Sequence, residues 1–416
     1  MTAIAFPHYP DPAATIVMPV YGARADVELS LRALLANTTV PHDVIIVDNA
    51  SPDGATDWLQ NNVTGVDLVC NPANMGFGAA CNQGAHRASA DVVVFLNSDA
   101  FVEPGWLEPL IETVGLPGAA AASARLHHPD GRLQEAGALI GPDGIGVAYG
   151  NTYPADRFQF RFRRTVDYAS GTVLAVRRRV FLEHGGFDPA FGLAYCEDVD
   201  LSMRFRAAGW STYYEPRAVA VHVQGASSPP DHIRALLERN TAILRERWHD
   251  VLSIRPPLTD LRQYPHRTLE SRDACAPDRL LVLCDTLPSA TGTDGRTGRF
   301  LMELATARPD ARIAVCTPTP VAAGSSVDRW CELGVEIGED PDGMEIWLRD
   351  RMGGFGAVIA ADPHAATILG PRTRMTQPQA EWLAPERMAE GVELLAAMGW
   401  APAPQDPSPH RTPLAP

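Results

Sequence analysis

Three acidic residues lie within four positions in the segment Glu197-Asp198-Val199-Asp200. A carboxyl group beside other carboxylates keeps its proton to a higher pH than usual, which suits a general base that works near neutrality. We therefore expect one acid to take the proton from an acceptor hydroxyl, while the others position the acceptor or orient the base. The structural alternative is that acids at the start of a helix interact favourably with the helix dipole.

A second group, Asn97-Ser98-Asp99, directly follows the apolar run 92–96. Side-chain oxygens at the end of a strand can hold Mg²⁺ or Mn²⁺, which prefer oxygen ligands and share them with substrate phosphates. His222, at the end of an expected strand, could add an imidazole ligand. The alternatives are a strand-end turn in which Asn and Asp cap the backbone, and a histidine with a purely structural role.

Two further segments could contact a nucleotide. Asp48, in Asp48-Asn49-Ala50-Ser51, could accept hydrogen bonds from a base N–H or from ribose hydroxyls. The segment 71–78 contains Gly76 and Gly78, which allow close backbone approach before a helix N-terminus, where diphosphate oxygens bind well. An ordinary turn and the packing of a strand–helix connection are the respective alternatives.

The elements that must position these residues are those of a mostly parallel α/β sheet, because short apolar runs alternate with helical patterns. In such sheets ligands bind at the carboxyl ends of the strands, and polar residues follow Val20, Val47 and Leu96. The expected strands are 15–20, 43–47, 66–70, 91–96, 173–176 and 213–223. The expected helices are 25–36, 56–60, 78–88, 180–184, 198–208 and 232–248, and Gly209 is expected to end the fifth. After residue 114 the pattern turns irregular, and 126–150 is typical of a hairpin-and-loop excursion.

A second α/β unit is expected after residue 278. The segment 256–278 contains four prolines and little apolar periodicity, which predicts a linker. The expected strands of the second unit are 280–284, 312–316, 335–337 and 357–360, and its expected helices are 299–307 and 380–398. The predicted domains are thus 1–255, catalytic, and 279–400, accessory, followed by a Pro-rich disordered tail over 401–416.

The composition limits the functions that this 416-residue chain can have. A formal charge of −15 argues against a nucleic-acid binder, since phosphate contacts need clustered cations, but a metal can still supply charge for a nucleotide ligand. The seven cysteines contain no C-x-x-C pair, which argues against a zinc site or a disulfide framework. The sequence shows no secretory signal, and its apolar runs are shorter than the about 20 residues of a membrane helix. We expect a cytoplasmic protein, with peripheral contact at the inner face of the membrane left open.

The ordered motifs resemble those of the family 2 glycosyltransferases of GT-A fold, within them most closely the rhamnosyltransferase-like branch of bacterial cell-surface enzymes. The resemblance spans residues 13–250. It is carried by Pro19-Val20-Tyr21, Val47-Asp48-Asn49-Ala50-Ser51, Asn74-Met75-Gly76-Phe77-Gly78, Asn97-Ser98-Asp99, Gly186-Phe187-Asp188 and Glu197-Asp198-Val199-Asp200. It implies a Rossmann-like mixed sheet and an inverting enzyme. Such an enzyme moves one sugar from a UDP-, dTDP- or GDP-linked donor to a hydroxyl of a glycan or lipid-linked acceptor.

The resemblance also implies roles for single residues. Those expected at the donor are Pro19, Tyr21, Asp48, Ser51, Asn74, Gly76, Asn82, Asn97 and Ser98. Asp198 matches the general base, with Glu197 beside it, and we expect Asp200 and Gly171 on the acceptor side. Asp99 and His222 match ligands of Mg²⁺ or Mn²⁺. Asn97 replaces the first Asp of the family's D-x-D metal motif, and the Q-x-x-R-W motif of processive synthases is absent, which favours single-sugar addition.

Other interpretations stay open. Residues 281–299 resemble the opening of the N-terminal half of a GT-B-type glycosyltransferase, so the second unit is expected to be accessory or truncated; an unrelated small α/β domain is the alternative. A non-catalytic nucleotide-sugar-binding or scaffold protein would also fit the altered Asn97 motif. A nucleotidyltransferase fits less well, because 19–25 supplies only Gly22 and Arg24 after the first strand.

Overall fold

The chain forms two compact units in the computed structural model. The first contains the described residues of Met1–Ala155 and Asp167–Ile254, and the second contains Asp156–Val166 and the described residues between Arg255 and Leu383. The residues that the structure describes are 3–223, 230–258, 269, 271–274, 276, 278–290, 295–318, 321, 324–338, 347–348, 351, 354–377 and 379–383. The predicted tail over 401–416 lies outside them.

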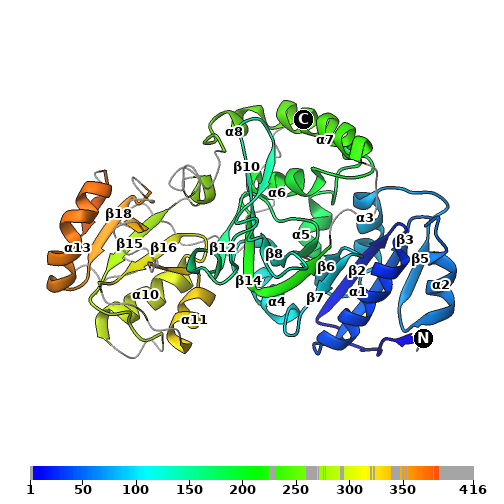
Figure 1. The fold of residues 1–416 in the computed structure, drawn as a ribbon, viewed down its shortest axis with the longest axis horizontal. Coiled ribbons are helices and arrows are strands. Elements are labelled where there is room, and N and C mark those ends of the chain that lie inside the picture. Colours follow the sequence, from blue (N-terminus) through cyan, green and yellow to red (C-terminus); the bar gives the residue numbers. More distant parts are fainter. Residues whose placement is uncertain are drawn as a thin grey trace. The chain divides into compact units, whose positions relative to one another are not determined.

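A mixed sheet forms the centre of the first unit, as the sequence predicts (Figure 1). Its strands run in the order β14-β8-β13-β6-β2-β3-β5. The bounds are β2 (Ala14–Val20), β3 (His42–Asp48), β5 (Asp67–Cys70), β6 (Val92–Leu96), β8 (Ala119–His127), β13 (Val173–Arg177) and β14 (Ser211–His222). β2, β3, β5 and β6 are parallel, while β13 runs antiparallel to both β6 and β8. The central strands are continuous apolar runs because helices cover both faces of the sheet.

The helices of the first unit are α1 (Arg24–Asn37), α2 (Ala55–Asn62), α3 (Phe77–Arg87), α4 (Leu107–Val114), α5 (Arg178–Glu183), α6 (Glu197–Ala207), α7 (Pro230–Arg247) and α8 (His249–Ser253). Successive residues of β2 face opposite cores, so Ile16 packs with Leu31 of α1 and Val17 packs with Ala80 of α3. Gly84 lets α3 approach closely, since a Cβ there would lie 2.2 Å from a methyl of Val17. In the described part of the chain, no helix is both long and apolar enough to cross a bilayer.

One long strand escaped sequence-based prediction. Residues 119–127 form β8, although the pattern after residue 114 predicts irregular structure. Five of its nine residues are alanine, which has little strand propensity. Its pairing with β13 and β14 fixes the strand conformation instead. The remaining short elements are β1 (Ile4–Ala5), β4 (Val63–Thr64), β7 (Ala100–Val102), β9 (Leu133–Glu135), η2 (Pro189–Phe191) and the predicted hairpin, formed by β10 (Ala138–Ile140) and β11 (Gly146–Ala148).

The second unit is a parallel five-stranded sheet in the order β17-β16-β15-β18-β19. Its elements are η1 (Phe158–Phe160), β12 (Arg164–Thr165), β15 (Arg279–Leu283), α10 (Gly295–Ala307), β16 (Arg312–Cys316), α11 (Ser325–Glu332), β17 (Val335–Gly338), β18 (Ala357–Ala360), α13 (Pro363–Thr376) and β19 (Glu381–Leu383). The four predicted strands are confirmed. The start of the helix expected over 380–398 is wrong, because β19 occupies it; residues 384–398 lie outside the described part.

Two segments assigned elsewhere by the sequence belong to the core of the second unit. Arg272, in the predicted linker 256–278, is 1% exposed and pairs with Asp273 at 2.7 Å and with Glu336 at 2.9 Å. Phe162, in the predicted catalytic domain 1–255, is fully buried, and the guanidinium groups of Arg272 and Arg312 lie 5.4 and 5.1 Å from the centre of its ring. Buried ion pairs leave no apolar periodicity in a sequence, which is why the linker prediction failed here.

Candidate active site

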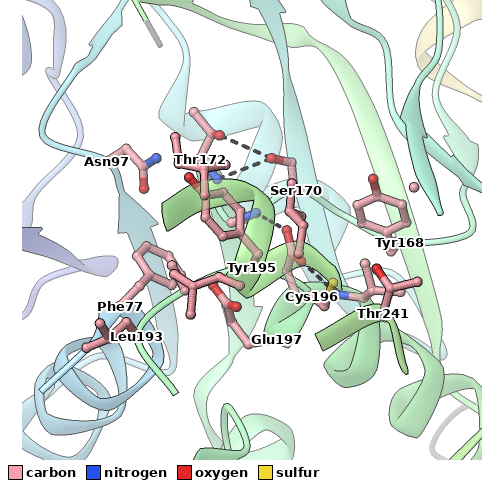
Figure 2. Close-up of a pocket in the computed structure, with 18 of the residues that line it drawn as sticks. Phe77, Asn97, Tyr168, Ser170, Thr172, Leu193, Tyr195, Cys196, Glu197 and Thr241 are labelled. Carbon is pink, nitrogen blue, oxygen red and sulfur yellow. Dashed lines mark hydrogen bonds between the residues drawn. The ribbon is translucent and has the colours of Figure 1, made fainter. Parts of the chain in front are cut away.

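A cavity of about 1220 Å³ lies in the first unit, at the carboxyl ends of β2 and β6. Figure 2 shows side chains around this cavity from the end of β6, from α3, from residues 168–172, from the loop before α6 and its first turn, and from α7. The sequence-predicted residues that line it are Pro19, Tyr21, Asn74, Asn97, Ser98, Asp99, Gly171, Glu197, Asp198 and His222. Strand ends place Tyr21, Asn97 and His222 at this cavity, while a helix N-terminus places Glu197 and Asp198 there.

The acid pair Glu197-Asp198 forms the first turn of α6. Asp198 accepts hydrogen bonds from the backbone N–H of Gly171 at 3.0 Å, through Oδ2, and of Val199 at 2.8 Å, through Oδ1. Oε2 of Glu197 is buried and has no hydrogen-bond partner. Burial raises the pKa of Glu197 to about 8, and the charge of Asp198 adds to this effect. Burial also raises the pKa of Asp198, while its two N–H donors act in the opposite direction. We therefore assign the negative charge of the pair to Asp198 and a proton to Glu197 near neutral pH.

The raised pKa of Glu197 should make the stability of the folded protein depend on pH. When folding raises the pKa of a carboxyl group from its usual 4.5 to about 8, the folded protein loses stability as the pH increases through that window. Glu197→Gln removes the ionisation, so we expect a melting temperature a few degrees above that of the unmodified protein at pH 8.5, and no difference near pH 4.5. Calorimetry at both pH values measures this. The exposed Glu183→Gln is the control, and an equal shift at both pH values would contradict the assignment.

Asp99 and His222 are brought together by strand pairing. His222 lies opposite Ala100 in the β14–β7 pair, and its Nε2 is 3.3 Å from Oδ1 of Asp99. Nδ1 of His222 lies 2.7 Å from the side-chain oxygen of Gln134, which can only accept, so Nδ1 carries the proton. In the neutral imidazole the lone pair is then on Nε2, next to Asp99.

This pair of atoms fits a divalent cation. A carboxylate oxygen and an imidazole nitrogen are both suitable ligands for Mn²⁺, and the hydrogen bond to Gln134 orients the ring, as hydrogen bonds to the free ring nitrogen of metal-bound histidines do. Within the described residues no group of three or more His, Cys, Asp or Glu side chains could hold a metal. Further ligands would have to come from substrate oxygens or water. Gln134 was missed by sequence reasoning, because only the non-local pairing of β9 and β14 with β8 brings it to His222.

Asp48 and Ser51 do not line the cavity. Asp48 is fully buried and accepts hydrogen bonds from Ser51 Oγ at 2.5 Å and Thr56 Oγ1 at 2.6 Å. Ser51 Oγ in turn accepts from the backbone N–H of Gly22 at 2.8 Å. These bonds fix the loops that follow β2 and β3, next to Tyr21, and direct contact of Asp48 and Ser51 with a donor stays a prediction.

Gly76 and Asn82 pack against neighbouring loops and do not face the cavity. A Cβ on Gly76 would lie 2.6 Å from the carbonyl oxygen of Gly192, so the close approach expected at Gly76 is made to this loop and not to an open cavity. The side-chain amide of Asn82 bonds both the N–H and the C=O of Phe187, at 2.9 and 2.8 Å. Neither residue lines the cavity. Both ends of the Asn82 amide are engaged with Phe187, and its contact with a donor stays a prediction.

Asp200, expected on the acceptor side, does not line the cavity. It is fully buried and accepts from Arg204 at 2.7 Å, Arg247 at 2.8 Å and Trp248 Nε1 at 3.0 Å. This ion-pair network ties the first turn of α6 to the end of α7. A third acid in a short acidic run was indistinguishable from its neighbours by sequence, and only its neighbours in space assign it a structural role.

The cavity wall also includes residues that sequence reasoning did not identify. The apolar side chains of Ile145, Leu193 and Leu237 are 52%, 38% and 40% exposed and line the cavity together with Ile233 and Leu236. Arg245 of α7 lines it too and forms no salt bridge with a described residue. The amphipathic pattern of 232–248 was visible in the sequence, but a pattern does not say whether its apolar face meets a core or a cavity.

Comparison with known proteins places these observations in a family. A family model described as "Glycosyl transferase family 2" matches residues 15–185. The N-acetylglucosaminyl-diphospho-decaprenol L-rhamnosyltransferase of Mycobacterium tuberculosis is 30% identical over 252 residues, which cover 53% of this chain and 81% of that protein. The uncharacterized protein y4gI of Sinorhizobium fredii is 24% identical over 277 residues, 63% of this chain. The match covers only 30% of the y4gI protein, so this chain spans less than a third of that relative.

A solved structure is also similar. The mannosyltransferase PcManGT from Pyrobaculum calidifontis, in complex with GDP-Man and Mn²⁺, aligns with 65% of this chain and 73% of its own, at 16% identity and a TM-score of 0.40.

Proposed function

The chain belongs to glycosyl transferase family 2 and has the GT-A fold, and on this premise we propose that it transfers one sugar from a nucleotide-diphosphate sugar to an acceptor hydroxyl with inversion at the anomeric carbon. One observation carries the proposal: the Glu197-Asp198 pair and the Asp99–His222 pair line the same cavity. A base and a site for the leaving diphosphate are the two groups that a single displacement needs.

In this proposal Asp198 removes the proton from the acceptor hydroxyl as that oxygen attacks the anomeric carbon. The hydrogen bond from the N–H of Gly171 keeps the Asp198 carboxylate oriented. Because Glu197 is protonated, it places no second negative charge beside Asp198. Pro19, Tyr21 and Asn74 are placed on the donor side. Asp99 and His222 would hold a Mg²⁺ or Mn²⁺ ion, which would neutralise negative charge on the leaving nucleoside diphosphate.

The acceptor we propose is a lipid-linked saccharide. Three partly exposed apolar side chains, Ile145, Leu193 and Leu237, line the cavity, and an alkyl or prenyl chain bound there would bury them. Arg245 adds a cation suited to an acceptor phosphate. The relative from Mycobacterium tuberculosis is named for an acceptor of this kind. A cytoplasmic location is part of the proposal, and the six cysteines in the described part of the chain, all of them free thiols, favour a reducing compartment.

Incubation with UDP-, dTDP- and GDP-sugars, Mn²⁺ and either prenyl-diphosphate-linked or free sugars tests the proposal. We expect release of nucleoside diphosphate with one donor class, and faster release with the lipid-linked acceptor. Tight donor binding without turnover would favour a non-catalytic nucleotide-sugar-binding protein. Release of pyrophosphate would indicate nucleotidyl transfer instead.

A further inference from the structure

The loop before the acid pair has an unusual backbone. Tyr195 and Cys196 both have positive φ angles, 76° and 72°, a conformation that bulky side chains rarely adopt. Two such residues in succession immediately precede Glu197 and Asp198, so the direction of the first turn of α6 depends on this loop. A strained backbone persists only where its surroundings hold it.

Asn240 of α7 holds the backbone of this loop by hydrogen bonds. The side chain is fully buried, and its Nδ2 lies 2.8 Å from each of the backbone oxygens of Phe191, Ala194 and Tyr195. Its Oδ1 accepts from Arg239 Nη1 at 2.7 Å, which fixes which end of the amide faces the loop. Arg239 Nη2 also donates to the carbonyl oxygen of Ala190 at 2.9 Å.

The same loop is held at two other points. The side chains of Cys196 and Thr241 are hydrogen-bonded (Figure 2), which adds a second link from α7 to the loop. On the opposite side, the N–H of Phe77 in α3 donates to the carbonyl oxygen of Leu193 at 2.8 Å. The loop is thus fixed between α3 and α7, and Asn240 makes more of these bonds than any other described side chain.

We propose that Asn240, oriented by Arg239, is a positioning residue that holds residues 191–196 in the strained conformation that aims Asp198 into the cavity. This Asn240 clamp goes beyond the proposed function, and its catalytic consequence rests on that function. Asn240 touches no reacting atom. It acts through the backbone that leads into α6, and so through the alignment of Asp198 with the N–H of Gly171.

The variant Asn240→Asp tests the clamp, because it keeps the size of the side chain and replaces the donating NH₂ with an oxygen that three carbonyl oxygens repel. We expect kcat to fall roughly tenfold to hundredfold, as for a small misplacement of a catalytic group. The KM for the donor and the Kd of the nucleoside diphosphate should stay unchanged. The ascending limb of the pH–rate profile should move to higher pH, because Asp198 loses aligned N–H donors that stabilise its carboxylate.

Hydrogen exchange provides a readout that does not need activity. In Asn240→Asp, amides of residues 191–199 should exchange faster while those of α1 stay unchanged. Leu34→Ala, a core substitution in α1, is the control for lost stability; assayed well below its melting temperature, it should leave kcat and the pH profile unchanged. If Asn240→Asp does not fold, Arg239→Met should give the same changes in smaller size.

Unchanged exchange, kcat and pH profile in Asn240→Asp would overturn the clamp. The clamp would also be overturned if Asn240→Asp and Leu34→Ala lowered kcat and sped up exchange across the protein to the same extent. A residue that only stabilises the fold would give that result. If the unmodified protein transfers no sugar, the proposed function fails, and the exchange experiment still decides about the clamp.

Discussion

Asp198→Asn should lower the rate of sugar transfer by about 10²- to 10⁴-fold, the usual contribution of a general base. Asparagine keeps the size of the side chain and an oxygen that can accept from the N–H of Gly171, but it cannot take a proton. The ascending limb of the pH–rate profile should disappear with the base. Because Asp198 lies on the acceptor side of the proposed site, the Kd of the nucleoside diphosphate should change less than twofold, by about 0.4 kcal/mol or less.

Steady-state kinetics together with calorimetric titration of the nucleoside diphosphate would measure both effects. Glu197→Gln is the comparison, because it removes the neighbouring carboxyl group and leaves the proposed base in place. It should keep most of the activity and leave the ascending limb in place, because Glu197 is already protonated and uncharged where Asp198 loses its proton. Survival of full activity in Asp198→Asn would show that another group acts as the base.

Asp99→Ala should produce the second large effect, a roughly 10²- to 10³-fold loss of Mn²⁺-dependent turnover, the range measured when a group that stabilises developing charge is removed. Asp99 is the one carboxylate that Asn97-Ser98-Asp99 retains, and its Oδ1 lies 3.3 Å from Nε2 of His222. Removing it leaves His222 as the only predicted protein ligand, which is too few for tight binding of the ion.

Titration with Mn²⁺, followed by electron paramagnetic resonance, measures this site independently of turnover. In the unmodified protein, Mn²⁺ should strengthen nucleoside diphosphate binding. In Asp99→Ala that gain should be lost, while binding without metal stays the same. Asp57→Ala, at an exposed carboxylate of α2, controls for the change in net charge. Retained Mn²⁺ dependence in Asp99→Ala would place the ion elsewhere, and turnover that is insensitive to chelators in the unmodified protein would contradict a metal site altogether.

The fold of the first unit was largely predictable because its central strands can be recognised from short stretches of sequence. β2, β3 and β6 contain the apolar runs 16–20, 44–47 and 92–96, which polar residues follow directly, and such runs predict buried parallel strands. The alanine-rich β8 carries no such signal, and neither does the segment Asp156–Val166, which belongs to the second unit. Both are held by partners distant in sequence, which a local pattern cannot contain.

In the candidate site, too, some residues could be predicted from the sequence and others could not. Asp99 and Asp198 were identified from motif and position, and both line the cavity. Asn82 and Asp200 were assigned to the site by the same reasoning, yet their polar atoms are bonded to Phe187 and to Arg204 and Arg247. An amide or a carboxylate can serve a ligand or a neighbouring segment, and the choice depends on which partner lies within hydrogen-bond distance.

The acids Glu197, Asp198 and Asp200 show both contributions, that of the sequence and that of the tertiary structure. The sequence by itself determined that acids stand at the start of a helix in a family 2 glycosyltransferase, because helix periodicity and motif order are local properties. Only the tertiary structure decided which acid is available. It buries Glu197, ties Asp200 to α7, and presents Asp198 to the cavity beside the N–H of Gly171. The physical reason is that burial and hydrogen-bond partners set the charge and direction of a carboxyl group, and here both come from segments distant in the sequence.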